Sequence, residues 1–221
     1  MNEKNLFRNK ILRGKFITFE GIDGSGKSTQ LRLVATDLRF RGLNILTTQE
    51  PGGTPLGRKL REVFLETDET VAPLAELLLF AADRAQHVNF LIKPALAEGK
   101  IVISDRYSDA TFAYQGAGRG LPQNIVKQII ELATGGLKPD LTLFFDLPVE
   151  AALLRTEIRD DAGEQKNRMD REKTDFYERV RQSYLELAAA EKKRFRVIDA
   201  NGSIEEIHAR TLKIVNDFLE R

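Results

Sequence analysis

A glycine-rich segment near the start of the chain has the residue types and spacing of a phosphate-binding loop. Residues 21–28 read Gly-Ile-Asp-Gly-Ser-Gly-Lys-Ser and fit the pattern G-x-x-x-x-G-K-[ST] at every fixed position. Glycines let backbone N–H groups turn toward a phosphate, Lys27 can reach the β- and γ-phosphates, and the Ser28 hydroxyl can ligate Mg²⁺. The pattern predicts a nucleotide held by its phosphates and does not separate kinases from GTPases or ATPases.

A second candidate site follows a short apolar run. Residues 101–104 read as a buried strand, and Asp105 and Arg106 come directly after it. An aspartate there can hold Mg²⁺ directly or through water, and the adjacent arginine can clamp a phosphate oxygen. The simpler interpretation is a salt bridge at the end of a strand. The sequence has no Asn-Lys-x-Asp loop for reading guanine, which argues against a GTPase.

Apolar runs alternate with longer amphipathic stretches, which is typical of a parallel sheet with crossover helices. We expect strands at 16–19, 44–48, 101–104, 141–147 and 196–199, and helices at 27–40, 73–97 (bent or split at Pro94), 122–133, 150–159, 173–193 and 203–219. Ser203 and Glu206 have the spacing of a capping box. The pattern predicts one α/β domain, a five-stranded parallel sheet with ligands beyond the carboxyl ends of its strands.

Composition sets further limits. The 221 residues suit one substantial domain, and 34 basic against 33 acidic side chains give no reason to expect a nucleic-acid partner. The absence of cysteine excludes disulfides, thiolate metal sites and cysteine nucleophiles. No apolar run approaches the roughly 20 residues of a membrane span, and residues 1–15 lack the apolar core of a signal peptide. We therefore expect a cytoplasmic protein with no membrane partner.

Four short strings, in this order and at this spacing, resemble the thymidylate kinases over about residues 15–215. They are Phe-Glu-Gly-Ile-Asp-Gly-Ser-Gly-Lys-Ser-Thr at 19–29, Glu-Pro-Gly-Gly-Thr at 50–54, Leu-Phe-Ala-Ala-Asp-Arg at 79–84, and Asp-Arg-Tyr at 105–107 leading to Ala-Tyr-Gln-Gly at 113–116. The resemblance implies a three-layer P-loop fold of the nucleoside-monophosphate-kinase type over residues 1–221, with a lid at about 151–172. It also implies phosphoryl transfer from ATP to dTMP, Mg²⁺ as cofactor, and a homodimer.

The resemblance also implies roles for single residues. ATP would be bound by Gly21, Ile22, Asp23, Gly24, Ser25, Gly26, Lys27, Ser28 and Thr29, and Mg²⁺ by Ser28, Asp105 and Glu50. dTMP would be bound by Glu50, Arg61, Phe80, Arg84, Arg106, Thr111, Tyr114 and Gln115. The catalytic residues would be Lys27, Asp23, Arg106, Arg155 and Arg159.

Within the dTMP set, the resemblance implies a contact for each part of the substrate. Phe80 would stack on thymine, Arg84 would donate to its O4, and Thr111 and Gln115 would bond the edge near N3. Tyr114 would pack under the deoxyribose, Asp23 would face its 3′-hydroxyl, and Arg61 and Arg106 would hold the phosphate. Taken singly, these residues have simpler interpretations: Phe80 as core, Arg84 as a solvated or paired charge, and Tyr114 and Gln115 as the cap of a turn.

A basic cluster lies between two predicted helices and surrounds Gly163. Its members are Arg155, Arg159, Lys166, Arg168 and Arg171. A mobile basic lid could close over ATP and exclude water. Because the phosphate loop has no arginine at its variable positions, we expect Arg155 or Arg159 to act on ATP, as in the bacterial members of the family. The simpler interpretation is a solvated charged hairpin.

The chain departs from the family pattern at Gln49, where an arginine is common. The lid departs as well, with Arg159-Asp160-Asp161-Ala162-Gly163 ahead of Asn167-Arg168. The 199–202 loop is expected near adenine. Two rival interpretations stay open: a kinase of the same fold acting on another nucleotide or nucleoside, and a nucleotide-binding module without turnover.

Overall fold

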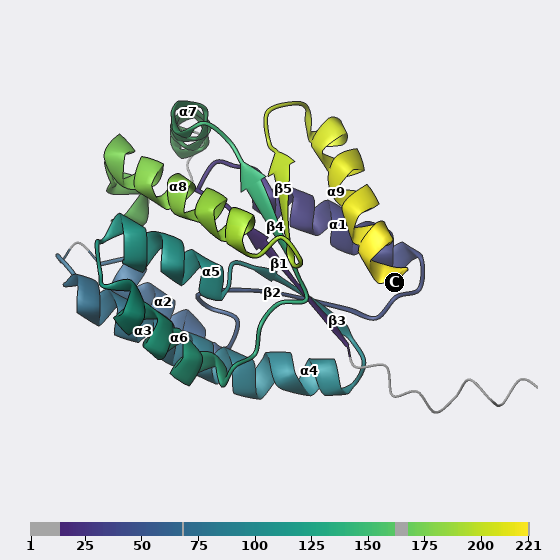
Figure 1. Ribbon diagram of the computed structural model, residues 1–221, viewed down its shortest axis with the longest axis horizontal. Helices are drawn as coiled ribbons and strands as arrows, with labels where there is room; N and C mark the ends of the chain where they lie inside the picture. The colour runs from purple at the N-terminus through teal and green to yellow at the C-terminus, as the bar shows by residue number, and fades with distance from the viewer. Residues whose placement is uncertain (1–13, 68, 162–167, 221) are drawn as a thin grey trace, which may run out of the picture.

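Five parallel strands form the middle layer of the computed structural model, which describes residues 14–67, 69–161 and 168–220 (Figure 1). The strands are β1 (Lys15–Glu20), β2 (Ile45–Gln49), β3 (Ile101–Asp105), β4 (Leu141–Asp146) and β5 (Phe195–Asp199). Their order in the sheet is β2-β3-β1-β4-β5. All five predicted strands are present within one residue at each end, so the predicted parallel α/β sheet is confirmed.

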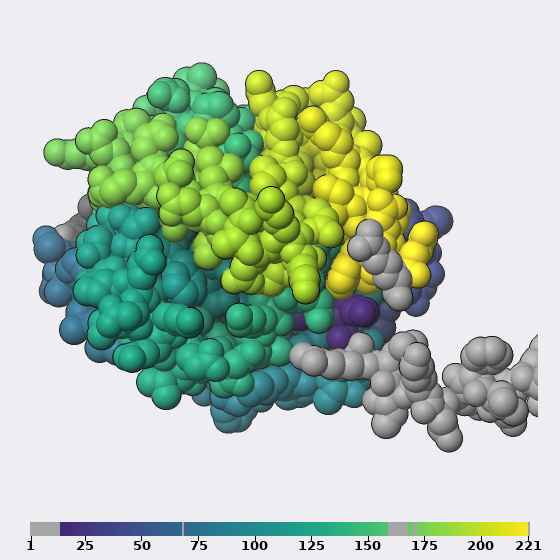
Figure 2. All heavy atoms as spheres, viewed as in Figure 1, coloured from purple at the N-terminus to yellow at the C-terminus, as the bar shows by residue number. Residues whose placement is uncertain are grey.

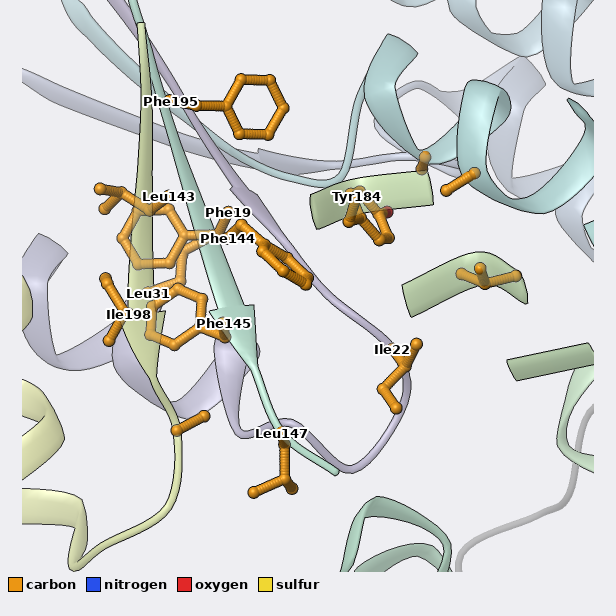
Figure 3. Packing of buried hydrophobic residues seen from close by; sticks show 14 of the residues in the cluster. Phe19, Ile22, Leu31, Leu143, Phe144, Phe145, Leu147, Tyr184, Phe195 and Ile198 are labelled. Carbon is orange, nitrogen blue, oxygen red and sulfur yellow. The ribbon is translucent and has the colours of Figure 1, made fainter. Parts of the chain in front are cut away.

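The central strand β1 is buried on both faces. Phe16, Ile17 and Phe19 have no exposed surface, as expected of a parallel strand covered by helices on either side. The ring of Phe19 stacks on Phe145 of β4 at 5.4 Å between centroids (Figure 3). In the space-filling view, the surrounding side chains hide almost all of β1 (Figure 2).

Helices cover the two faces of the sheet (Figure 1). On one face lie α1 (Lys27–Phe40) and α9 (Ile204–Leu219), side by side and joined by a hydrogen bond of 2.9 Å from Gln30 to the Ile204 carbonyl. The other face carries α3 (Pro73–His87), α4 (Lys93–Ala97), α6 (Gln123–Thr134) and α8 (Thr174–Ala190). At the start of α9, Ser203 and Glu206 form the predicted capping box.

The structure changes three of the predicted boundaries. The predicted helix at 73–97 is one helical stretch with a π-helical segment, Val88–Ile92, between α3 and α4. Pro94 lies in the first turn of α4, directly after this π-helical segment. Helix α7 (Val149–Asp161) extends two residues beyond the predicted end, and α8 ends at Ala190 rather than Lys193.

Several helices have no counterpart in the predicted pattern. Helix α2 (Pro55–Leu65) follows Thr54, whose hydroxyl accepts the Gly57 N–H at 3.0 Å. This Thr-Pro start is a capping signal that the sequence does contain. Helix α5 (Ser108–Thr111), its π-helical continuation Phe112–Gly118, and a short 3₁₀ helix, Arg168–Arg171, have no such signal. None of the helices in the described ranges combines the length and apolar character that a membrane span requires.

Glu20, at the carboxyl end of β1, is a carboxyl group enclosed by the core. It accepts hydrogen bonds from the Tyr107 N–H and the Tyr184 hydroxyl, both at 2.8 Å. Burial, with the nearby charge of Asp109, raises the pKa of Glu20 from 4.5 to about 8, against the lowering effect of the Tyr184 hydrogen bond and the Arg106 charge. The carboxyl group is therefore protonated in the folded protein at pH values where the unfolded chain has released the proton.

We predict that Glu20→Gln flattens the dependence of stability on pH. Between pH 4.5 and about 8 the folded wild type holds a proton that the unfolded chain lacks, so this group lowers the free energy of unfolding as pH rises, by up to about 1.4 kcal/mol per unit. Glutamine fits the same space and cannot titrate. Urea unfolding from pH 5 to 8 measures the slope.

The matched control is Glu98→Gln, at an exposed carboxylate that pairs with Lys100. This variant should keep the wild-type slope. Equal slopes for Glu20→Gln and wild type would contradict a proton on Glu20 in the folded state.

Candidate active site

The phosphate loop connects β1 to α1, as its sequence predicts. Gly24 and Gly26 have positive φ angles of 79° and 85°, a conformation that favours glycine. Ile22 is 2% exposed and points into the core, which anchors the loop (Figure 3). Gly24 lies against α7, because a Cβ at this position would be 2.2 Å from the Ala152 carbonyl oxygen. The loop therefore has backbone geometry and close packing that a side chain at Gly24 would disrupt.

Lys27 and Ser28 face the end of β3. The Lys27 Nζ lies 3.6 Å from Asp23 Oδ1 and 3.8 Å from Asp105 Oδ1. The Ser28 hydroxyl donates to Asp105 Oδ2. These contacts follow from the sheet, because β1 and β3 are neighbours and Phe19 is in register with Asp105.

The pair of Ser28 and Asp105 suits a Mg²⁺ ion. Asp105 Oδ1 is buried and accepts no hydrogen bond from the described part of the chain. A hydroxyl and a carboxylate are hard oxygen ligands, and Mg²⁺ at nucleotide sites takes one or two carboxylates together with phosphate oxygens and water. No group of three or more acidic or histidine side chains that could hold a metal occurs within the described ranges.

Glu50, the third predicted metal ligand, makes other contacts. Its carboxylate accepts from Arg84 Nε at 2.7 Å and lies 2.8 Å from His87 Nδ1. The side chain is 2% exposed. Each carboxylate oxygen thus already has a partner, and a metal role for Glu50 stays a prediction.

Arg106 occupies a left-handed backbone position with φ 67°, which is uncommon for a residue other than glycine. Three neighbouring hydrogen bonds hold the turn: Arg106 N–H to Phe19 O, Tyr107 N–H to Glu20, and Ser104 Oγ to Arg106 O. Burial alone would lower the pKa of Arg106, but Asp23 and the other anionic or phenolic neighbours raise it well above its ordinary value. Its positive charge is permanent.

Two hollows meet around Arg106. The first, of about 540 Å³, lies beside α3 and α5; the second, of about 1120 Å³, lies over the phosphate loop. Four charged residues line both hollows: Asp23, Glu50, Arg61 and Arg106. Arg106 Nη2 donates to Asp23 Oδ1 at 2.9 Å and to the Tyr114 hydroxyl at 3.1 Å. Ligands in the two hollows can therefore meet at a junction that is lined by charged side chains.

The first hollow has the character of a site for a small aromatic ligand. Phe80, Tyr114 and Ala110 give it apolar walls, and Arg84, Thr111 and Gln115 add polar groups. Phe80 packs edge-on to Phe64 at 4.8 Å while also lining the hollow. The structure thus brings together every residue predicted to bind dTMP: Glu50, Arg61, Phe80, Arg84, Arg106, Thr111, Tyr114 and Gln115.

Arg84 is a buried, paired charge. It donates through Nε to Glu50, through Nη1 to Thr111 Oγ1 at 2.8 Å, and through Nη2 to the Tyr107 carbonyl at 3.0 Å. A guanidinium has five N–H groups, so donors remain for a ligand. Although burial works to lower it, the pKa of Arg84 is raised by Glu50 and its neighbours.

The two described members of the predicted lid cluster lie in different places. Arg155 on α7 lines the hollow over the phosphate loop and donates to the Ala200 carbonyl at 3.3 Å. Arg168 instead donates to Glu76 and to the Phe64 carbonyl, on the side of the first hollow. Gly163 and Lys166, and the side chains of Arg159 and Arg171, lie outside the part of the chain that the structure describes. Of the two described members, Arg155 alone faces the phosphate loop.

Sequence reasoning missed several residues of the two hollows. Arg32 and Gln49 line the hollow over the phosphate loop, and Leu65 and Met169 line the first. Glu76 bonds Gln115, although 39 positions separate the two. The helical periodicity of α1 could have placed Arg32 near Ser28. No local pattern indicated Met169 or Glu76.

Strand order, phosphate loop and paired hollows together define the class: a P-loop kinase of the nucleoside-monophosphate type. Comparison with known proteins narrows it. The profile of the thymidylate kinase family matches residues 19–211. The chain belongs to the thymidylate kinase family, whose members transfer the terminal phosphoryl group of ATP to dTMP.

Individual relatives align with almost the whole of this chain. A thymidylate kinase of Synechococcus sp. is 50% identical over 200 residues, covering 90% of this chain and 93% of the relative. One from Chlorobium luteolum is 46% identical over 206 residues, covering 91% and 96%. The crystal structure of thymidylate kinase from Ehrlichia chaffeensis superposes with a TM-score of 0.74 at 36% identity, covering 92% of this chain and 98% of that one.

We predict that Gly24→Ala weakens ATP binding, seen as a KM for ATP raised about tenfold or more. The added methyl group would meet the Ala152 carbonyl at 2.2 Å, so α7 or the phosphate loop must move. Steady-state kinetics with varied ATP measure the effect.

Gly42→Ala is the matched control. Gly42 has nearly the same φ, 82° against 79°, but nothing lies within 4 Å of its Cβ position. Its free energy of unfolding should fall by about 1–2 kcal/mol, because alanine is strained in the left-handed conformation. Its KM for ATP should equal that of the wild type. A wild-type KM for Gly24→Ala would contradict the close packing of α7 on the loop.

Proposed function

We propose that this protein phosphorylates dTMP to dTDP with ATP as donor, a step in the supply of dTTP. The observation that carries the proposal is the junction of the two hollows at Asp23, Glu50, Arg61 and Arg106. ATP binds with its phosphates over the phosphate loop, dTMP binds in the first hollow, and the transferring group crosses the junction.

On the ATP side, residues 21–29 hold the phosphates, and Lys27 reaches the β- and γ-phosphates. Ser28 and Asp105 would hold Mg²⁺, with Glu50 on the acceptor side of the same region. The ion would supply positive charge that offsets the charge of the phosphates. Gly24 and Ala152 keep the loop and α7 in contact, which directs Arg155 toward the γ-phosphate.

On the acceptor side, Arg61 and Arg106 hold the dTMP phosphate. Phe80 stacks on the thymine ring, and Arg84, Thr111 and Gln115 contact its polar edge. Tyr114 packs under the deoxyribose and disfavours a 2′-hydroxyl, while Asp23 faces the 3′-hydroxyl. The Tyr114 hydroxyl contacts Arg106 at 3.1 Å, so the sugar and phosphate contacts belong to one connected group.

Transfer is in line and needs no covalent intermediate. The acceptor phosphate oxygen attacks the γ-phosphorus, and ADP leaves. Positioning and fixed positive charge supply most of the catalysis, because the charge on the transferring group is spread over its oxygens. Lys27, Arg106 and a lid arginine, Arg155 or Arg159, supply that charge, and Asp23 keeps Arg106 in place.

The protein acts in the cytoplasm as a homodimer in this proposal, which the family resemblance supports. Two other functions make different demands on the site. A kinase for another monophosphate would require a different polar edge near Arg84 and Gln115. A binding module without turnover would have no need for Lys27, Ser28, Asp105 and Arg106 together.

ADP formation with Mg-ATP and a panel of dTMP, dUMP, dCMP, UMP and AMP tests the function. We expect the highest kcat/KM with dTMP. Strong preference for another monophosphate would support kinase activity but contradict the assignment of the first hollow to thymine. Nucleotide binding without ADP formation at saturating dTMP would favour the binding module.

Among the lid arginines, we expect Arg155→Ala to lower kcat about 100-fold or more, the scale seen when one charge-stabilising donor is removed from an active site. Arg155 is chosen because it lines the hollow over the phosphate loop. Arg159→Ala is the matched comparison, with the same charge change one turn along α7, and should have the smaller effect. Two near-normal variants would contradict a catalytic arginine on α7.

A further inference from the structure

Glu76 is a buried carboxylate outside the set of substrate contacts. It lies on α3, has no exposed surface, and receives four hydrogen bonds. Oε1 accepts from Gln115 Nε2 at 2.8 Å and from Arg119 Nε at 3.1 Å. Oε2 accepts from Arg119 Nη2 at 3.1 Å and from Arg168.

These contacts leave one orientation for the Gln115 amide. An ionised carboxylate can only accept hydrogen bonds, so the NH₂ end of Gln115 must face Glu76. Turning the amide over would place two acceptors 2.8 Å apart in a buried region, which is strongly unfavourable. Burial alone would raise the pKa of Glu76, but hydrogen bonds from Arg119, Gln115 and Arg168 lower it below its ordinary value. Glu76 therefore stays ionised.

The carbonyl oxygen of Gln115 is the group left for a ligand. Gln115 lines the first hollow, and its side chain makes no other hydrogen bond within residues 14–67, 69–161 and 168–220. The same hollow thus presents an acceptor from Gln115 and the remaining N–H donors of Arg84, whose Nη1 bonds Thr111 four residues before Gln115. An acceptor beside a donor is complementary to a pyrimidine that carries N3–H and C4=O, as thymine and uracil do. Cytosine has the reverse pattern, with an acceptor at N3 and an amino group at C4.

We propose that Glu76 is a specificity-determining residue: by fixing the Gln115 amide, it makes the site accept pyrimidines protonated at N3 and reject cytosine. The inference rests on the proposed function, because it assigns the base of the acceptor to the first hollow. Glu76 acts through Gln115 and touches no substrate, so it is a positioning residue. Arg84 contributes to the same discrimination independently.

The test compares dUMP with dCMP, which differ only at N3 and C4 and both lack the 5-methyl group. The readout is the ratio of kcat/KM for dUMP to that for dCMP. In Glu76→Gln, the new amide can donate or accept, so Gln115 is free to turn. We expect the ratio to fall about tenfold or more, mainly through slower use of dUMP, while Arg84 preserves some preference. A loss of folded protein alone would lower the apparent kcat/KM for both substrates by the same factor and leave the ratio unchanged.

Glu172→Gln is the matched control. Glu172 contacts Arg119 Nη1 at 2.6 Å, so this variant also removes a carboxylate from Arg119 but leaves Gln115 bonded to Glu76. Its ratio of dUMP to dCMP use should equal that of the wild type. An equal fall in both variants would show that charge near Arg119, and not the orientation of Gln115, sets the ratio.

The exchanged pair Glu76→Gln with Gln115→Glu gives a second test. It keeps the net charge of the cluster, and the amide at position 76 can donate to the carboxylate at position 115. That carboxylate can present only an acceptor to the base, so the ratio should return toward the wild-type value. Failure to recover would overturn the proposal.

If Glu76→Gln does not fold, Glu76→Asp carries the test. It keeps the charge beside Arg119 and Arg168 but draws the carboxylate back from Gln115, so the ratio should fall by a smaller factor. An unchanged ratio in a folded variant at position 76 would overturn the inference while leaving the proposed function intact. A wild type that uses neither dTMP nor dUMP would instead overturn the proposed function.

Discussion

The ion pair between Arg106 and Asp23 joins the two halves of the site. Arg106 Nη2 lies 2.9 Å from Asp23 Oδ1, at the junction of the two hollows. The pair depends on an unusual backbone conformation, φ 67° at Arg106, which is of order 1–3 kcal/mol less favourable than an ordinary one. Glu20 and Ser104 hold that conformation through the hydrogen bonds on either side. The core beneath β1 and β3 thus fixes a positive charge at the junction of the two hollows.

The parallel sheet makes this junction possible. β1 lies between β3 and β4, so the phosphate loop and the Asp105-Arg106 pair leave the sheet at the same edge. The inner strands β1, β3 and β4 are buried along most of their length because helices cover both faces, and acidic residues stand at their carboxyl ends: Glu20, Asp105 and Asp146. Helix α7 then approaches the loop closely enough to direct Arg155 over it.

Buried charges around the first hollow are paired with one another. Glu50 binds Arg84 and His87, and Glu76 binds Arg119 and Arg168. Such pairs add little net stability, because desolvation offsets much of their attraction. Their effect here is geometric: a carboxylate holds each side chain in one orientation, Glu50 for Arg84 and Glu76 for Gln115. Asp83 belongs to the same region, where burial and the Glu50 charge raise its pKa to about 6.

The class of reaction came from the resemblance to a family, and the sequence by itself determined the strands and the phosphate loop. These features are local: a strand, a glycine turn and a helix start are encoded within a few neighbouring residues, and the apolar pattern of a covered parallel strand is easily recognised. Resemblance to a family then gave the residues of the first hollow, including Arg61 on a helix that the periodicity did not predict. Tertiary structure alone decided the rest. Arg168 turns to Glu76, 92 positions away, rather than to the phosphate loop with Arg155. Glu76 orients Gln115 across 39 positions. Contacts of this range depend on how helices pack across the sheet, and no spacing along the chain encodes them.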